Sequence, residues 1–207
     1  MTEHTHTETG LTNKTTQFVV RVAMLSALGF LLMLLEFPLP FMPPWMKLDI
    51  SDTAVIAAGC GLGPWGAVAV ALIKNLLHFL LKNNDGTIVG EIAAFAIGVA
   101  IAVPLSFIYR RDKSRKSMLM GLVVGGIVMT VAGALLNAYV LLPVYAKVFG
   151  MPIESLVAMA TKVNPLITDL KGLIFIAVVP FNIIKAVVLA ILMMLLYNVI
   201  ERTVSIK

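Results

Sequence analysis

Charged side chains are scarce in this chain, at 13% of its 207 residues, whereas soluble domains average about 25%. Apolar residues make up 59% of the chain, and its mean hydropathy is +0.97. So few charges cannot form the polar shell of a soluble core of this size, which predicts a membrane protein with several spans. Cys60 is the only cysteine, so an intramolecular disulfide and a cysteine-based metal cluster are both excluded.

Several catalytic motifs are also missing. The chain has no Gly-x-x-x-x-Gly-Lys-Ser/Thr phosphate loop, no His-Glu-x-x-His motif and no Gly-x-Ser-x-Gly elbow. These absences argue against an ATPase of that type, a zinc protease and a serine hydrolase. No two-fold internal repeat is visible, which counts weakly against a free-standing secondary transporter. We therefore expect a protein that is not an enzyme and that holds neither a metal ion nor a cofactor.

The apolar segments predict an all-α protein with six transmembrane helices and a flexible cytoplasmic tail over residues 1–15. A span needs about 20 apolar residues, and the Gly-Leu-Gly-Pro sequence at 61–64 divides one over-long run into two helices. Ser51 and Asp52 can cap the second helix. Six spans place both termini and the basic residues 110–116 in the cytoplasm, as the positive-inside tendency favours. The predicted helices cover residues 16–36, 51–62, 64–82, 87–109, 118–142 and 180–200, within a single domain over 16–201.

The start of the last helix has two interpretations. Pro180 suits the first turn of a helix, and residues 180–200 are long enough to span a membrane. A start near Thr168 would instead give a longer helix with a kink at Pro180. We expect the later start, and we expect the fifth helix to end at Pro143.

The connector between the first two spans, residues 36–52, combines prolines with a large apolar load. Its prolines remove amide donors and disfavour helix, so the connector is expected to be stiff and extended. The prolines are Pro38, Pro40, Pro43 and Pro44, and the apolar side chains are Phe37, Leu39, Phe41, Met42, Trp45 and Met46. A solvated loop would not need these apolar residues. Either the connector is a plug packed against the rest of the protein, or it closes over an apolar ligand.

Polar side chains recur at one predicted depth, about 7–8 Å below the outer rim of the membrane. Asn137 lies near the end of the fifth predicted helix, Lys185 lies near the start of the sixth, and Asn182 is one turn from Lys185. Glu91 falls at a similar level in the fourth helix. Such side chains are costly in a membrane unless they are paired or functional. They either line a ligand pocket, or form a Glu91–Lys185 pair that pins two helices, with the lysine able to reach water.

Two further groups of residues have open interpretations. Lys74 and His78 share one face of the third helix and could form a proton relay, although a lone histidine near a helix end is more often a hydrogen-bonded structural group. Ala23 and Ala27 are four apart on the first helix, and such small residues let another helix approach closely in a membrane. That neighbouring helix belongs either to this chain or to a partner protein.

Four segments occur in a specific order: the connector at 36–52, Lys74-Asn-Leu-Leu, Leu136-Asn-Ala-Tyr-Val-Leu-Leu-Pro-Val-Tyr and Pro180-Phe-Asn-Ile-Ile-Lys. Together they resemble the riboflavin-specific substrate-binding subunit, or S component, of energy-coupling factor (ECF) vitamin transporters. The resemblance covers about residues 16–200. It implies six helices, a riboflavin site near the outer face of a prokaryotic plasma membrane, and association with a transmembrane coupling subunit and two cytoplasmic ATPases.

The resemblance also implies roles for particular residues. The family's site amides and lysine correspond to Asn137, Asn182 and Lys185. Its first-loop contacts fall on Met46, Lys47, Leu48 and Asp49, and its docking motif for the coupling subunit resembles the Ala23 and Ala27 pattern. The segment 90–95 lacks the asparagine expected in the fourth helix, so the resemblance carries over no contact from that amide.

The chemistry of riboflavin agrees with these roles. Its flat, uncharged ring system needs apolar walls, which Trp45, Phe41 and Met46 can supply. Its ring carbonyls and polyol tail need hydrogen-bonding partners, which the two asparagines and the lysine can supply. Two alternatives stay open: an S component for another vitamin, and a free-standing proton-coupled carrier that uses Lys74, His78 and Glu91.

Overall fold

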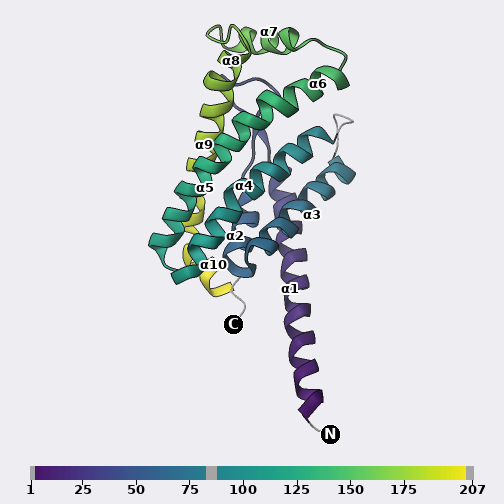
Figure 1. The fold of residues 1–207 in the computed structure, drawn as a ribbon, viewed down its shortest axis with the longest axis vertical. Helices are drawn as coiled ribbons and strands as arrows, with labels where there is room; N and C mark the ends of the chain where they lie inside the picture. Colours follow the sequence, from purple (N-terminus) through teal and green to yellow (C-terminus); the bar gives the residue numbers. More distant parts are fainter. Residues whose placement is uncertain (1–2, 83–87, 204–207) are drawn as a thin grey trace.

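The chain folds into an elongated bundle of helices, shown by a computed structural model that describes the backbone of residues 3–82 and 88–203 (Figure 1). Side chains are described for residues 14–82 and 88–202. The long elements are α1 (Glu3–Met33), α2 (Asp52–Leu62), α3 (Pro64–Lys82), α4 (Val89–Asp112), α5 (Arg115–Leu136) and α9 (Val179–Leu195). The shorter elements are β1 (Phe37–Pro38), β2 (Lys47–Leu48), α6 (Leu142–Val148), α7 (Ile153–Val163), α8 (Leu170–Gly172) and α10 (Tyr197–Thr203), with two π-helical segments, η1 (Asn137–Leu141) and η2 (Leu173–Val178).

Five helical stretches in the described part of the chain are long and apolar enough to cross a membrane. They are Lys14–Met33, Pro64–Lys82, Val89–Asp112, Arg115–Val148 and Leu170–Leu195. The second predicted span, α2, has 11 residues, about 16 Å or half of the hydrocarbon core. The membrane-protein class is therefore supported, while the sixth span stays a prediction. The flexible cytoplasmic tail also stays a prediction; the backbone is helical from Glu3, and α1 extends beyond the rest of the bundle (Figure 1).

Two helices continue through prolines at which the sequence predicted ends. The fifth helix passes Pro143 and ends at Val148, and the last bundle helix begins at Leu170, ten residues before Pro180. A proline inside an α-helix lacks an N–H donor and clashes with the carbonyl four residues earlier. Each proline here comes two residues after the end of a π-helical segment, whose wider turn relieves that clash. The predicted boundaries at 142 and 180 were wrong for this reason, and the start near Thr168 was the better alternative.

The turn between α2 and α3 agrees with the prediction from the Gly-Pro sequence. Gly63 adopts φ 94°, a conformation that favours glycine, and its N–H donates to the Ala58 carbonyl. Pro64 then begins α3, where its missing N–H costs nothing. Because this turn is tight, α2 and α3 pack side by side.

Close helix packing builds the main core, near the end of the bundle that carries α10. An added Cβ at Gly125 of α5 would lie 2.4 Å from the backbone oxygen of Ile101 in α4. Only a glycine permits that approach, which in a membrane takes the place of a hydrophobic driving force between helices. Buried residues such as Leu105, Met129 and Leu189 fill the space between α4, α5 and α9.

The connector returns into the bundle as a short antiparallel ladder. Phe37 pairs with Leu48 and Pro38 pairs with Lys47, so the predicted extended conformation is confirmed for these strands, whereas residues 39–46 between them form turns. Between the strands, its side chains join a second buried cluster, at the end of the bundle that carries α7. This cluster includes Met42, Met46 and Leu48 from the connector, with Leu142, Leu156, Leu173, Ile174, Val178 and Phe181 from the helices. In this structure the connector therefore fills the space between α6, α7 and η2.

Candidate functional site: a buried charge ring beneath the connector

Five polar side chains form a closed ring where the connector meets α2, α3 and α9. Lys185 Nζ lies 2.9 Å from Asp49 Oδ2 and 2.8 Å from Asp52 Oδ2. Lys74 Nζ lies 2.7 Å from Asp52 Oδ1 and donates to Ser51 Oγ at 2.5 Å. The Ser51 hydroxyl donates in turn to Asp49 Oδ1, which closes the circuit. We call these five residues the charge ring.

Local sequence explains how three of these residues come together. The Ser51 N–H donates to Asp49 Oδ1 at 2.9 Å, the two-residue turn that aspartate side chains commonly make. Asp52 is the first residue of α2 and turns inward. The Ser51 side chain makes no capping hydrogen bond to the α2 backbone, so the predicted cap was wrong for Ser51. Its hydroxyl serves the charge ring instead.

The charge ring is buried and electrically balanced. Asp52 is 0% exposed, Lys74 1%, Lys185 5% and Asp49 9%. Removing four charges from water is tolerated only when each has a partner, and here two carboxylates face two ammonium groups. Burial alone raises the pKa of Asp49, but Lys185, Lys74 and the Ser51 hydroxyl outweigh it and hold the pKa below its ordinary value.

Two glycines leave room for the ring. An added Cβ at Gly98 of α4 would lie 2.8 Å from Asp52 Oδ1. An added Cβ at Gly29 of α1 would lie 3.3 Å from the Lys74 side chain and 3.3 Å from Ala54. Helices α1 and α4 therefore close the two sides of the ring that α2 and α3 do not cover.

The two predicted site amides meet at Gly133 of α5. Asn137 Nδ2 donates to the Gly133 carbonyl at 2.8 Å, and an added Cβ at Gly133 would lie 2.7 Å from Asn182 Nδ2. Asn182 Nδ2 also donates to the Val178 carbonyl at 2.8 Å. Each amide still has a second N–H and an oxygen to offer a ligand. Asn182 and Lys185 are three residues apart and share a face of α9, so amides and charge ring adjoin.

These residues lie farther from their helix ends than the predicted boundaries implied, while their depth in the membrane stays a prediction. Lys185 lies 15 residues after Leu170, about 22 Å along the helix. Asn137 lies 11 residues before Val148, about 16 Å from that end. Both helices continue past the prolines, so the polar groups lie well inside the bundle, and the connector reaches down to them.

The connector residues divide into buried and exposed sets. Met46 and Leu48 are buried, Trp45 is partly buried, and Phe41 is 54% exposed. Lys47 is exposed and its Nζ lies 2.8 Å from Glu36 Oε1, on the outer strand edge rather than in the charge ring. The structure therefore brings Met46, Leu48 and Asp49 toward the helices, and leaves Phe41 and Lys47 outside that group.

Glu91 belongs to a different polar pair. Its Oε1 lies 3.2 Å from His78 Nδ1, with both side chains buried between α3 and α4. The postulated Glu91–Lys185 pair is thus replaced by two separate interactions, Glu91 with His78 and Lys185 with the two aspartates. Lys74 is bound to the charge ring and not to His78, which removes the geometric basis of a Lys74–His78 relay.

Comparison with known proteins decides the family. The profile of the ECF transporter substrate-specific component matches residues 17–197. The chain belongs to this family. It is 37% identical to the riboflavin transporter RibU of Staphylococcus aureus (strain TCH60) over 180 residues, covering 87% of this chain and 88% of that protein. It is 33% identical to the riboflavin transporter FmnP of Bacillus subtilis (strain 168) over 180 residues, covering 86% and 89% respectively.

A solved structure also matches this S component. It is described as "Structure and mechanism of the S component of a bacterial ECF transporter", with a TM-score of 0.71 and 35% sequence identity, and the match covers 90% of this chain and 96% of that one. The S component is therefore a multi-pass bacterial membrane protein of the transporter class rather than an enzyme family.

The predicted docking residues lie on the outside of the S component. Ala23 and Ala27 are exposed on α1, whereas Val22 and Ser26, on the adjoining face, are buried against the bundle. The small side chains thus form a shallow stripe flanked by exposed Met24 and other apolar residues. The two predicted alternatives were a neighbouring helix of this chain and a helix of a partner protein. No helix in the described part of this chain covers the stripe.

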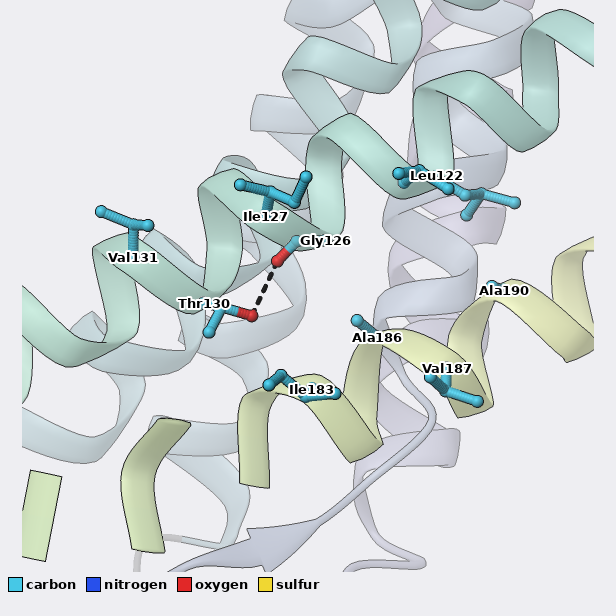
Figure 2. A pocket seen from close by; sticks show the side chains of 10 residues that line it. Leu122, Gly126, Ile127, Thr130, Val131, Ile183, Ala186, Val187 and Ala190 are labelled. Atoms are coloured by element: carbon cyan, nitrogen blue, oxygen red, sulfur yellow. Dashed lines mark hydrogen bonds between the residues drawn. The ribbon is translucent and has the colours of Figure 1, made fainter. Parts of the chain in front are cut away.

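Two surface grooves are apparent away from the charge ring. One, of about 330 Å³, runs between α5 and α9 over Gly126 and Ala186, with the Thr130 hydroxyl bonded to the Gly126 carbonyl (Figure 2). Its walls include Ile127 and Ile183, both largely exposed on the apolar outer face of the bundle. The other, of about 360 Å³, lies between α7 and α8. Neither of these two grooves is lined by the predicted ligand residues.

Sequence reasoning missed Ser51, Asp52 and Lys74 as parts of the site. Ser51 and Asp52 were interpreted only as a helix cap, and Lys74 only as half of a relay. One signal was present: two aspartates and two lysines within apolar segments each need a partner. The pairing itself joins residues 22 to 136 positions apart, and the sequence contains nothing that specifies which partners meet.

Proposed function

We propose that this S component binds riboflavin between the connector and the helices beneath it, using Asn137, Asn182 and Lys185 as hydrogen-bonding groups. The observation that carries the proposal is their convergence: amides from η1 and α9 meet at Gly133, one turn from the Lys185 ammonium. The named relatives, RibU and FmnP, are riboflavin transporters.

The polar groups match what a flavin ring needs. An ammonium has three donors, and two of them face the aspartates of the charge ring. The remaining donor is suited to a ring carbonyl, while the asparagine amides can pair with the ring's alternating donors and acceptors. A buried polar group left unsatisfied costs about 1–3 kcal/mol, so such a site would favour this heterocycle over a purely apolar ligand.

The connector supplies the apolar walls and the gate in this proposal. Met46 and Leu48 now fill the space beneath the strands, and Trp45 lies partly buried beside them. Riboflavin would displace these side chains outward and then be covered by them, with exposed Phe41 folding over the ligand. The buried plug and the lid over a ligand are thus two states of one segment.

Transport then follows from orientation and partners. The proposed S component has six spans with both termini and residues 110–116 in the cytoplasm, so the connector faces outward across the plasma membrane. It captures riboflavin there and delivers it inward by reorienting with a transmembrane coupling subunit and two cytoplasmic ATPases. The exposed Ala23 and Ala27 stripe on α1 is the proposed docking surface for the coupling subunit.

Purification and titration test the proposal. Protein purified from rich medium should carry a flavin absorption spectrum, and stripped protein should quench riboflavin fluorescence on binding. Asn137→Ala and Asn182→Ala should each weaken affinity by about 5- to 150-fold, from the loss of about 1–3 kcal/mol. Asn198→Ala is the matched control, because Asn198 is exposed beyond the far end of α9.

Several outcomes would contradict the proposal. Unchanged affinity in both site variants would remove the site assignment. Failure of riboflavin to bind, together with tight binding of another vitamin, would leave the family membership and change the substrate. Uptake into vesicles that contain this chain alone, driven by a pH gradient, would support the proton-coupled carrier instead.

A further inference from the structure

Lys74 is the most deeply buried lysine among the described residues, and it contacts none of the three groups proposed to bind the ligand. Its side chain is 1% exposed. Its methylene groups pack beneath Gly29 of α1, and its ammonium reaches the connector and α2. A buried lysine is costly, so its position in α3 needs an explanation beyond packing.

The circuit of contacts provides one. From Lys74, one path runs through Asp52 to Lys185, and the other runs through Ser51 and Asp49 to the same Lys185. Both paths end on the ammonium proposed to contact the ligand. The second path also passes through the connector at the base of the proposed lid.

We infer that Lys74 is a positioning residue for riboflavin binding: it holds Asp52 and Ser51 in place and so sets the orientation of Lys185 and the seat of the connector. The inference rests on the proposed function, since it assigns Lys74 an effect on a ligand that Lys74 does not touch. It gives a role to a residue that neither the ligand chemistry nor the docking stripe requires.

Charge balance explains why a cation is needed at this position. Without Lys74, the two aspartates would face one ammonium, and Lys185 would be drawn fully into them. Less of its hydrogen-bonding capacity would then be directed at the ligand. Replacing Asp52 by asparagine in the same protein would restore neutrality, leaving the Asp49–Lys185 pair intact. The two changes should therefore be non-additive, as coupled neighbours are.

The test compares riboflavin affinity and melting temperature in purified, flavin-free protein. Lys74→Met removes the charge while keeping an unbranched side chain, and we expect its dissociation constant to rise by about tenfold or more. The double variant Lys74→Met/Asp52→Asn should bind more tightly than Lys74→Met alone. Lys82→Met is the matched control, because Lys82 lies on the same helix but is partly exposed and 3.8 Å from Glu36. Its affinity should not change.

A second variant guards against simple misfolding. Ser51→Ala breaks the hydroxyl link between Lys74 and Asp49 without changing any buried charge, so it should fold and bind riboflavin about threefold to tenfold more weakly. The inference is overturned if Ser51→Ala binds like the unmodified protein, or if folded Lys74→Met does so. It is also overturned if the double variant binds no better than Lys74→Met.

The outcomes separate this inference from the proposed function. If Asn137→Ala weakens riboflavin binding and Lys74→Met and Ser51→Ala do not, the site stands and the positioning role is wrong. If the unmodified protein does not bind riboflavin at all, both are wrong. If Lys74→Met lowers only the melting temperature and leaves affinity intact, Lys74 is purely structural.

Discussion

Gly98→Ala is a precise test of the charge ring, because it adds one methyl group against one carboxylate. The new Cβ would lie 2.8 Å from Asp52 Oδ1 and 3.6 Å from Asp52 Cγ. Ordinary contacts between heavy atoms are about 3.4 Å or longer, so the oxygen would have to retreat by about 0.6 Å. That oxygen is held 2.7 Å from Lys74 Nζ. A shift of this size would stretch the interaction to about 3.3 Å, outside the usual range.

The expected magnitude follows from two opposing effects. Over-packing a buried position costs about 1–3 kcal/mol, whereas replacing glycine by alanine in a helix gains up to about 1 kcal/mol. We therefore expect Gly98→Ala to lose about 1–2 kcal/mol of stability, a decrease of a few degrees in melting temperature. Because Asp52 also contacts Lys185, riboflavin affinity should fall by about tenfold.

Gly90→Ala is the matched control on the same helix. Its added Cβ would meet only the Tyr145 hydroxyl, at 3.6 Å, so it should be tolerated. Differential scanning fluorimetry and fluorescence titration of both variants in detergent measure stability and affinity. If Gly98→Ala equals Gly90→Ala in both measurements, Asp52 is not confined as the structure shows, and the reasoning about the charge ring fails.

Two further predictions concern docking and pH. Ala27→Leu should abolish riboflavin uptake by the assembled transporter, because a larger side chain would block close helix approach, while riboflavin binding to the isolated subunit should not change. The control Met24→Leu, at a neighbouring exposed position, should transport normally. Equal uptake by the two variants would refute docking at this stripe. The pKa of Asp49 is lowered in the folded state, so its contribution to stability is fully present above the unfolded value of about 3.9 and is lost as pH falls through the folded-state pKa. The melting temperature should therefore decrease less steeply below about pH 4 in Asp49→Asn than in the unmodified protein, and equal slopes would contradict the coupling of Asp49 to the lysines.

The overall class of this protein could be predicted from composition alone. The chain has too few charged residues to form the polar shell of a soluble protein, so its long apolar runs predict a membrane protein. Four ordered segments indicated an S component, which the family match confirmed. That the connector is not helical was predictable as well, because proline constrains its own backbone and that of the preceding residue locally. Such effects need no knowledge of distant parts of the chain.

Helix boundaries at Pro143 and Pro180 show where local rules fail. The same proline restriction predicted two helix ends, yet the structure accommodates both prolines with a π-helical turn just before each. Continuing the helices keeps their apolar residues packed in the second buried cluster with Leu142 and Phe181. This tertiary gain outweighs the local preference, and it places Asn137 and Lys185 farther from their helix ends than the prolines suggest.

The residues of the proposed flavin site could be singled out from the sequence, because each is a polar side chain in an apolar segment and carries its own cost of burial. The partners of these residues could not be predicted, because the Asp52 carboxylate can pair equally well with any ammonium group that the fold brings near. Only the packing of α2, α3 and α9 selected Lys74 and Lys185 for that carboxylate. Pairing energies depend on distance in space, and distance in space is a property of the folded chain as a whole.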